Sequence, residues 1–138
     1  MITRDVGIKT LHNLASRCLR ILREAEQLYL RGGSAVNQGL RHFDEHWANI
    51  SNAQKWMEWH AKEDKVAATL CSMFPLEGPL CLSRRLTPQE LLRWAEAAIS
   101  AARSVKDRCA EATNLGNLGS IYLVSVKHDM PLHYLNKP

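Results

Sequence analysis

The five prolines of this chain stand at positions 75, 79, 88, 131 and 138, so residues 1–74 contain none. A proline removes a backbone N–H donor and clashes with the preceding turn of a helix, so its absence leaves long helices free to form. The stretches between the prolines are rich in Ala, Leu, Glu, Arg and Gln, which favour helix. We therefore expect an all-α protein whose 138 residues form a single helical domain.

Apolar residues recur at intervals of three and four positions along most of the sequence, as they do on the buried face of a helix. The segment 80–86 is compatible with either a short helix or an extended connection. Antiparallel helices joined by short turns form either a bundle or a solenoid. The predicted helices, about five to six in all, cover roughly residues 8–30, 35–61, 65–74, 87–106 and 107–126, with a short last segment at 131–136.

Short signals mark the ends of these helices. Gly32 and Gly33 end the first helix, because glycine readily takes the left-handed conformation of a C-terminal cap. Ser34 and Asp64 can cap the second and third helices, since their side chains accept hydrogen bonds from free backbone N–H groups. Thr87-Pro88-Gln89-Glu90 combines a Thr cap, a first-turn Pro and a Glu at the third helical position, which is a strong helix start.

The composition, 46% hydrophobic and 23% charged, is ordinary for a globular protein. The net charge of +4 is mild, with seven Lys or Arg against three Asp or Glu in residues 1–41. A basic first helix is the footprint of a nucleic-acid-binding helical bundle, which we keep as an alternative function. The simpler interpretation is a solvated helix face, because Arg20 and Glu24 are spaced for ordinary pairing on a helix surface.

The four cysteines, Cys18, Cys71, Cys81 and Cys109, contain no C-x-x-C pair, which is the spacing of zinc and redox motifs. We expect them to be reduced and mostly buried as small hydrophobic side chains. The N-terminus shows no apolar run behind a basic start, and the longest uncharged stretch is too short and too polar to span a bilayer. The expected location is the cytoplasm, with no membrane contact, no metal and no other cofactor.

The fifth predicted helix carries the most specific pattern in the chain. Residues 112–122 read Ala-Thr-Asn-Leu-Gly-Asn-Leu-Gly-Ser-Ile-Tyr. Leu115, Leu118, Gly119 and Tyr122 stand at the spacing of helix A of a tetratricopeptide (TPR) repeat, which this segment resembles. In that arrangement Gly119 lets a partner helix approach closely, and the three larger side chains fill the space around it.

The helix before this pattern resembles helix B of a preceding repeat, with Trp94 and Ala98 at matching positions. The resemblance implies antiparallel helix pairs stacked into a TPR-like right-handed α-solenoid. Residues 87–138 would then hold a TPR-like helix B, a helix A and a truncated next helix.

The middle of the chain is similar to a second known arrangement. Residues 39–56 resemble the helix that leads into the repeats of bacterial STAND-type signalling ATPases, where a nucleotide-switch domain is followed by a helical connector and a TPR sensor. The residues that carry this likeness are Phe43, Trp47, Ile50 and Trp56. The resemblance implies that residues 1–86 are a helical connector or cap region. The chain has no G-x-x-x-x-G-K-[ST] phosphate loop.

These resemblances imply a protein–protein interaction module, a scaffold or sensor segment rather than an enzyme, that binds a peptide or protein partner in a TPR-like groove. In this repeat family the A helices line the groove. Asn117 is the strongest candidate, because an amide both donates and accepts hydrogen bonds and so suits a bound peptide backbone. The groove-facing residues carried over from the repeat pattern are Thr113, Gly116, Asn117, Ser120 and Leu123.

The repeat pattern stops at Pro138, before a further helix B is complete. Repeat arrays need a polar terminal helix, because each repeat buries its apolar face against the next one. We therefore expect Leu118, Ile121, Tyr122 and Val126 to lack cover. Association between copies of the chain through these C-terminal helices would bury them.

His42-Phe43-Asp44-Glu45-His46 matches H-x-x-E-H, the pattern of one class of zinc proteases. The two histidines share a helix face and can both ligate zinc, with Glu45 as the base. A third ligand would come from elsewhere, for example from Glu77 or Glu90. The simpler interpretation is a pair of histidines on a half-buried helix face, so a zinc-dependent hydrolase is a minor alternative and we predict no catalytic residue.

Overall fold

A computed structural model of the chain describes residues 4–129, with side chains described from Gly7 to Val124. The described part contains seven helices and no strand, which confirms the all-α prediction. The helices are α1 (Arg4–Arg31), α2 (Ser34–Glu45), α3 (Trp47–His60), α4 (Lys65–Glu77), α5 (Pro79–Arg85), α6 (Pro88–Ser104) and α7 (Arg108–Asp129). The last predicted segment, 131–136, lies outside the described residues.

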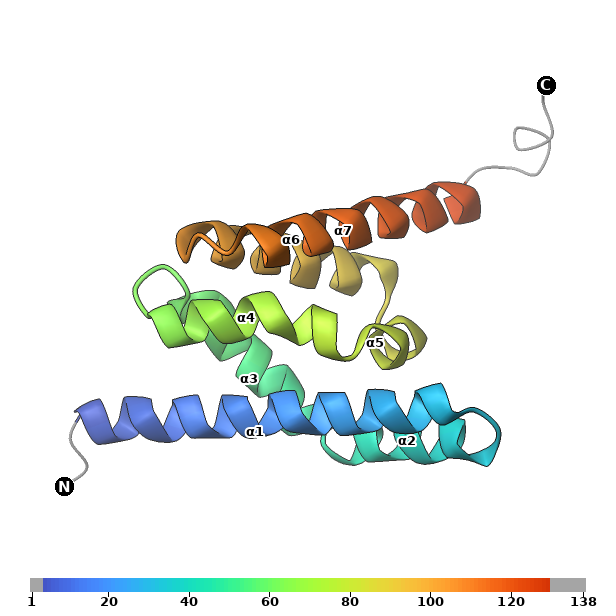
Figure 1. The fold of residues 1–138 in the computed structure, drawn as a ribbon, viewed down its shortest axis with the longest axis horizontal. Helices are drawn as coiled ribbons and strands as arrows, with labels where there is room; N and C mark the ends of the chain where they lie inside the picture. The colour runs from blue at the N-terminus through green and yellow to red at the C-terminus, as the bar shows by residue number, and fades with distance from the viewer. Residues whose placement is uncertain (1–3, 130–138) are drawn as a thin grey trace.

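The helices are arranged in layers around α4 (Figure 1). α1 and α2 run side by side along one side of the molecule, and α6 and α7 lie along the opposite side. α4 lies between these two pairs, α3 crosses from α1 to α4, and the short α5 closes one end. The core therefore runs through every layer, and its largest fully buried side chains include Trp94, Phe43, Phe74, Leu22, Ile50 and Met57.

The α1–α2 hairpin is tightest at Gly39. A Cβ atom at this position would lie 2.5 Å from the backbone oxygen of Ala25 and 3.0 Å from the backbone nitrogen of Tyr29. Only a residue without a side chain allows the two helices to approach so closely. The turn between them uses Gly32 and Gly33, with φ of 76° and 58°, so the predicted glycine stop is confirmed.

The prediction of a single helix over 35–61 is wrong, because the helix is interrupted at His46. The backbone of His46, at φ −109° and ψ 6°, ends α2 and precedes α3. Trp47, directly after the break, stacks on Phe43 with ring centroids 5.4 Å apart and on Trp94 at 6.1 Å. This aromatic packing offsets the helical hydrogen bonds that the break removes.

The predicted caps differ in outcome. Asp64 accepts hydrogen bonds from two backbone N–H groups in the first turn of α4, as expected. Thr87 and Glu90 form the complete capping box that was predicted for α6. Ser34 does not cap α2, because Gly33 occupies the cap position and the helix begins at Ser34 itself.

Pro75 does not end α4, which continues to Glu77 and is therefore longer than the predicted 65–74. Pro75 lacks the N–H that would donate to the carbonyl of Cys71, so α4 loses one helical hydrogen bond at this point. The ring of Pro75 is buried, and this burial favours the helical path over an early turn.

The segment 80–86, for which the sequence allows either a helix or an extended connection, is largely helical and belongs to α5. Glu26 of α1 is buried and accepts hydrogen bonds from the backbone nitrogens of Leu80 at 3.0 Å and Cys81 at 3.1 Å. A carboxylate at this place stabilises the helix start by satisfying free N–H groups.

No single helix in the described part is long and apolar enough to cross a membrane. α4 and α5 taken together have the length and apolar composition of a membrane span, but they are bent by 79° relative to each other.

Three of the four cysteines, Cys18, Cys71 and Cys81, are buried, whereas Cys109 is exposed. This confirms that the cysteines are mostly core residues. Burial raises the pKa of the Cys71 and Cys81 thiols to about 12, so both behave as neutral, small hydrophobic groups.

Candidate functional site

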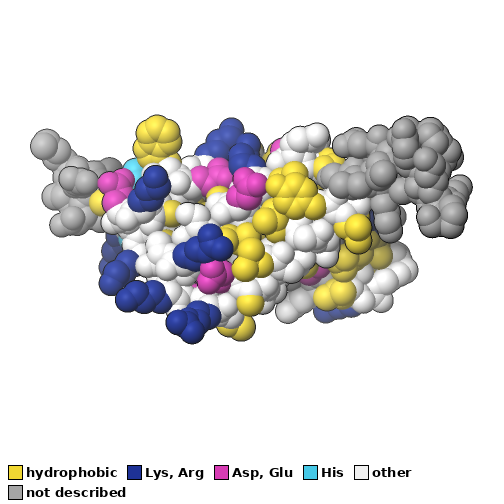
Figure 2. All heavy atoms as spheres, turned by 90° about the horizontal axis from the view of Figure 1, so that it is seen from above, with side chains coloured by type: hydrophobic (Ala, Val, Ile, Leu, Met, Phe, Trp, Pro, Cys, Tyr) yellow, Lys and Arg dark blue, Asp and Glu magenta, His cyan; other side chains and the backbone are white. Residues whose placement is uncertain are grey.

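One flank of α7 is apolar and exposed in the described part of the chain. Leu115, Leu118, Gly119 and Tyr122 lie on it, because residues three and four positions apart share a helix face; we call this set the α7 stripe. Leu115 is 43% exposed, Tyr122 is 48% exposed and Leu118 is half-buried. Figure 2, which looks down on this side of the molecule, shows hydrophobic side chains over its middle and right, with most of the Lys and Arg side chains in view to the left.

Within residues 7–124, whose side chains are described, the lack of cover expected at the C-terminal helix is found for Tyr122, which is 48% exposed. Leu118 and Ile121 are half-buried, so they are only partly open. The side chain of Val126 lies outside the described ones.

The close helix contact expected at Gly119 is not found in the described part of the chain. A Cβ atom at Gly119 would meet nothing within 4 Å, and the same holds for Gly116. α7 packs on α6 and α4 through another face, which carries the buried Ala110 and Asn114. The amide of Asn114, a residue that the sequence analysis did not single out, donates to the backbone carbonyl of Ser72 on α4 at 3.0 Å.

Part of the α7 stripe has a counterpart on α4, where the corresponding segment is mostly buried. Leu70-Cys71-Ser72-Met73-Phe74 corresponds position by position to Leu118-Gly119-Ser120-Ile121-Tyr122. α6 lies over the α4 copy: the Phe74 ring is 6.4 Å from that of Trp94, and Cys71 lines a small hollow together with alanines of α6. This internal likeness is the signal that the sequence analysis missed.

Two adjoining hollows of about 160 and 430 Å³ form a groove between α5, α6 and α7 on the other flank of α7, which we call the α5–α7 groove. Both hollows are lined by Ser83, Leu91, Ser120 and Ile121, and Asn117 lines the first of them. Two of the predicted binding residues, Asn117 and Ser120, are therefore brought together beside largely apolar walls.

The other predicted binding residues lie outside this groove. Thr113 is exposed, and its hydroxyl donates to the backbone carbonyl of Cys109 at 2.9 Å. Leu123 is 59% exposed, and Gly116 faces open space in the described part. All the predicted positions share one broad face of α7, but the neighbouring helices border only the edge of it.

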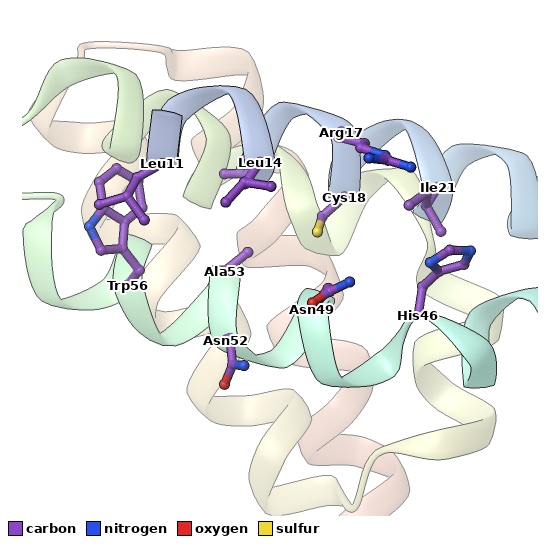
Figure 3. A pocket seen from close by; sticks show the side chains of 11 residues that line it. Leu11, Leu14, Arg17, Cys18, Ile21, His46, Asn49, Asn52, Ala53 and Trp56 are labelled. Atoms are coloured by element: carbon purple, nitrogen blue, oxygen red, sulfur yellow. The ribbon is translucent and has the colours of Figure 1, made fainter. Parts of the chain in front are cut away.

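A further hollow of about 310 Å³ lies between α1 and α3 (Figure 3). Leu11, Leu14 and Ile21 of α1 form one wall, and Asn49 and Trp56 lie on the α3 side. Leu14 is 52% exposed, so the wall is accessible. This α1–α3 groove was not predicted, because the sequence does not show that these two helices lie side by side.

The basic residues of α1 are partly engaged in ion pairs. Arg23 donates two hydrogen bonds to the carboxylate of Glu77, at 3.0 and 3.1 Å. The pair expected between Arg20 and Glu24 is not found among the described ion pairs; instead, the Glu24 carboxylate lies 3.0 Å from Nε2 of His42. The first helix is therefore a surface of mixed charges along this part.

The residues of the H-x-x-E-H segment do come together. The ligand atoms of His42, Glu45 and His46 all lie within 4.8 Å of one another. The further ligands suggested from the sequence are wrong: Glu77 is paired with an arginine of α1, and Glu90 belongs to the capping box of α6.

No family model matches the sequence, and no significant match is found among curated proteins or solved structures. The function therefore has to be inferred from the surfaces of the chain itself. Those surfaces are the α7 stripe, the α5–α7 groove, the α1–α3 groove and the His42 cluster.

Proposed function

We propose that this chain is a protein-interaction module with a TPR-like, right-handed solenoid arrangement, and that the α7 stripe docks a helix of a protein partner. The observation that supports this most is the pattern shared by α4 and α7. On α4 a helix of the chain itself packs on the pattern, whereas on α7 Gly119 and Tyr122 of the corresponding segment are exposed in the described part of the chain. The partner is therefore expected to present a helix similar to α6.

The contacts between α6 and α4 indicate what such a helix needs. Trp94 packs against Phe74, and the small side chains of α6 lie next to Cys71. On α7, Tyr122 takes the place of Phe74 and Gly119 takes the place of Cys71. A partner helix with one aromatic residue and several alanines on its docking face would fit this surface and extend the stack.

A labelled synthetic peptide with the sequence of α6, residues 88–104, is a direct probe of this surface. Titration with the full chain, followed by fluorescence anisotropy, should give saturable binding. We expect Tyr122→Asp to weaken it by at least about tenfold, because an unpaired carboxylate in an apolar contact costs more than about 1.4 kcal/mol. Thr113→Asp is the matched control, since it adds the same charge to an exposed position away from the stripe.

Three results would contradict the stripe as the docking site. One is the absence of saturable binding to the wild-type chain. Another is an equal loss in Tyr122→Asp and Thr113→Asp. The third is binding that Tyr122→Asp leaves unchanged, because the peptide would then be displacing the chain's own α6 from α4. Circular dichroism of both variants is the control that tests whether they remain folded.

The α5–α7 groove is the second contact surface in this proposal. Its apolar walls suit the side chains of an extended peptide, and the Asn117 amide can donate to and accept from a peptide backbone. We expect Asn117→Ala to weaken binding of an identified partner about threefold to tenfold. Unchanged affinity would remove the groove from the proposal.

Association between copies is the corresponding proposal for the chain without a partner. The open stripe of one copy would then be covered by another. Light scattering should show a mass that rises with concentration, and Tyr122→Asp should reduce this rise. A monomeric mass at every concentration would reject self-association while leaving the peptide test unaffected.

A further inference from the structure

Three side chains with metal-binding atoms meet where α2 ends. His42 and Glu45 stand in the last turn of α2, and His46 is the residue at which the helix breaks. Their ligand atoms all lie within 4.8 Å of one another. Among the described residues, this is the one group of three or more His, Cys, Asp or Glu side chains found in a metal-binding arrangement.

The chemistry of this set suits a particular class of ion. Imidazole nitrogens and a carboxylate oxygen are preferred ligands of zinc and of neighbouring divalent transition metals, whereas Mg²⁺ and Ca²⁺ prefer oxygen ligands alone. Ligand atoms of a tetrahedral zinc ion, each about 2.0–2.1 Å from the metal, lie roughly 3.3 Å apart. Side-chain rotations alone can close the remaining distance, since both histidines are only half-buried and Glu45 is exposed.

A fourth group comes from the neighbouring helix. Glu24 of α1 holds its carboxylate 3.0 Å from Nε2 of His42. Histidines that bind metals usually donate their other ring N–H to a carboxylate, which fixes the orientation of the ring. Glu24 is therefore placed either to orient His42 or to complete the coordination.

The charges around the cluster are mixed. Arg31 and Arg41 line the same hollow of about 470 Å³ as Glu24, His42 and Glu45. Two carboxylates thus stand against two guanidinium groups, so the surroundings neither repel nor strongly attract a dication. The affinity must then come from the coordination bonds themselves.

We propose that His42, Glu45 and His46 form a binding site for a divalent transition metal ion of the zinc class, with Glu24 as the supporting carboxylate. The bound ion would join the end of α2 to the start of α3 and, through Glu24, to α1. This site is separate from the docking surfaces on α7, so it stands or falls independently of the proposed interaction function.

The test uses the metal-free chain and added metal alone. Isothermal titration with Zn²⁺ should show one ion bound per chain, and Co²⁺ should give the visible absorption of a low-symmetry nitrogen and oxygen site. We expect His46→Ala to weaken binding by at least about a hundredfold and Glu24→Gln by about tenfold, as is usual for a ligand and for its supporting carboxylate. Zn²⁺ should also raise the melting temperature of the wild-type chain but not that of His46→Ala.

His60→Ala is the matched control. His60, the last residue of α3, pairs at 3.1 Å with Glu63 in the turn that follows, so it offers a histidine and a carboxylate without a third ligand in the described part. Its removal should leave Zn²⁺ affinity unchanged. If His60→Ala and His46→Ala lose affinity equally, if wild type binds no Zn²⁺, or if Mg²⁺ binds as tightly as Zn²⁺, the proposed site is wrong. Because His46 stands at a helix break, His42→Ala provides a second variant should His46→Ala fail to fold.

Discussion

α4 and α7 carry similar five-residue segments, yet the one on α4 is mostly buried and the one on α7 is partly exposed. On α4, Leu70, Cys71 and Phe74 are buried; α6 packs against Phe74 and Cys71, and α1 and α3 pack on α4 as well. On α7, Gly119 and Tyr122 are open in the described part of the chain. The pattern therefore fixes which face of a helix is apolar, but a neighbour decides whether that face contributes to stability or remains available for binding.

The loss of unfolding free energy on substitution should differ most between the two aromatic residues, Phe74 of α4 and Tyr122 of α7. Phe74→Ala removes a fully buried ring and should lower the free energy of unfolding by about 3–5 kcal/mol. Tyr122→Ala removes a half-exposed ring and should change it by no more than about 0.5 kcal/mol. Urea unfolding followed by circular dichroism measures both. If Phe74→Ala does not fold, Phe74→Leu keeps the comparison, and equal losses at the two positions would show that α7 is covered after all.

Glycine substitutions sharpen the same contrast between covered and open helix faces. Gly39→Ala would force a Cβ atom against the backbone of α1, so we expect a loss of about 1–3 kcal/mol in unfolding free energy. Gly119→Ala meets open space inside a helix and should raise stability by about 0.5–1 kcal/mol. The measurement is again urea unfolding. A destabilised Gly119→Ala would mean that another helix lies against α7.

The N-terminal caps of α4 and α7 differ as well. Burial alone would raise the pKa of the Asp64 carboxyl, but the bond to His12 at 2.7 Å and two backbone N–H groups outweigh it and hold the pKa below its usual value. Asp64→Ala should therefore cost about 0.5–2 kcal/mol at neutral pH. The Asp107 side chain at the start of α7 accepts one described bond, from Ala110, so its loss should cost less.

The Asp64 contribution should depend on pH in one direction. Its folded-state pKa is depressed, so the stabilisation is fully present above the unfolded value of about 3.9 and disappears as the pH falls through the folded value. The difference in unfolding free energy between wild type and Asp64→Ala should accordingly shrink below about pH 4. A difference that stays constant down to acid-unfolding conditions would contradict a stabilising contact between the Asp64 carboxylate and His12. His12→Gln tests that contact directly.

The smallest change is predicted for thiol modification. Cys109 is exposed and should react with a thiol reagent in the folded chain without altering the unfolding free energy by more than about 0.5 kcal/mol. Cys71, the α4 counterpart of Gly119, is fully buried with a pKa of about 12 and should react only as the chain unfolds. Mass spectrometry of modified peptides separates the two sites. Fast modification of Cys71 in the folded chain would show that α6 does not cover it.

The sequence predicts those features that depend on neighbours along the chain. The capping box at Thr87, the cap at Asp64 and the stop at Gly32 and Gly33 all follow from local residue types, and all are present. The break at His46 does not follow, because Trp47 stacks on a ring that lies much further along the chain.

The candidate site was predictable only in part for the same reason. Asn117 and Ser120 were placed on the correct helix, but the groove beside them depends on where α5 lies. The repeat pattern predicts a close helix contact at Gly119, and this contact is not found in the described part. The pattern specifies which face of the helix is apolar, but it does not specify whether a neighbouring helix packs on that face. Asn114 escaped notice, since a buried amide is recognised only by the carbonyl that it binds.

The bond between Glu26 and the start of α5 bears on the order in which the chain folds. The α1–α2 and α6–α7 hairpins join residues that are near in sequence, so each closes a short loop at low entropic cost. Glu26 and Leu80 are 54 positions apart, so their contact closes a longer loop at a higher entropic cost and forms only once α1 and α5 have come together. We therefore expect the hairpins to form early and the Glu26 bond to form late. The bond would then slow unfolding without contributing to the folding nucleus.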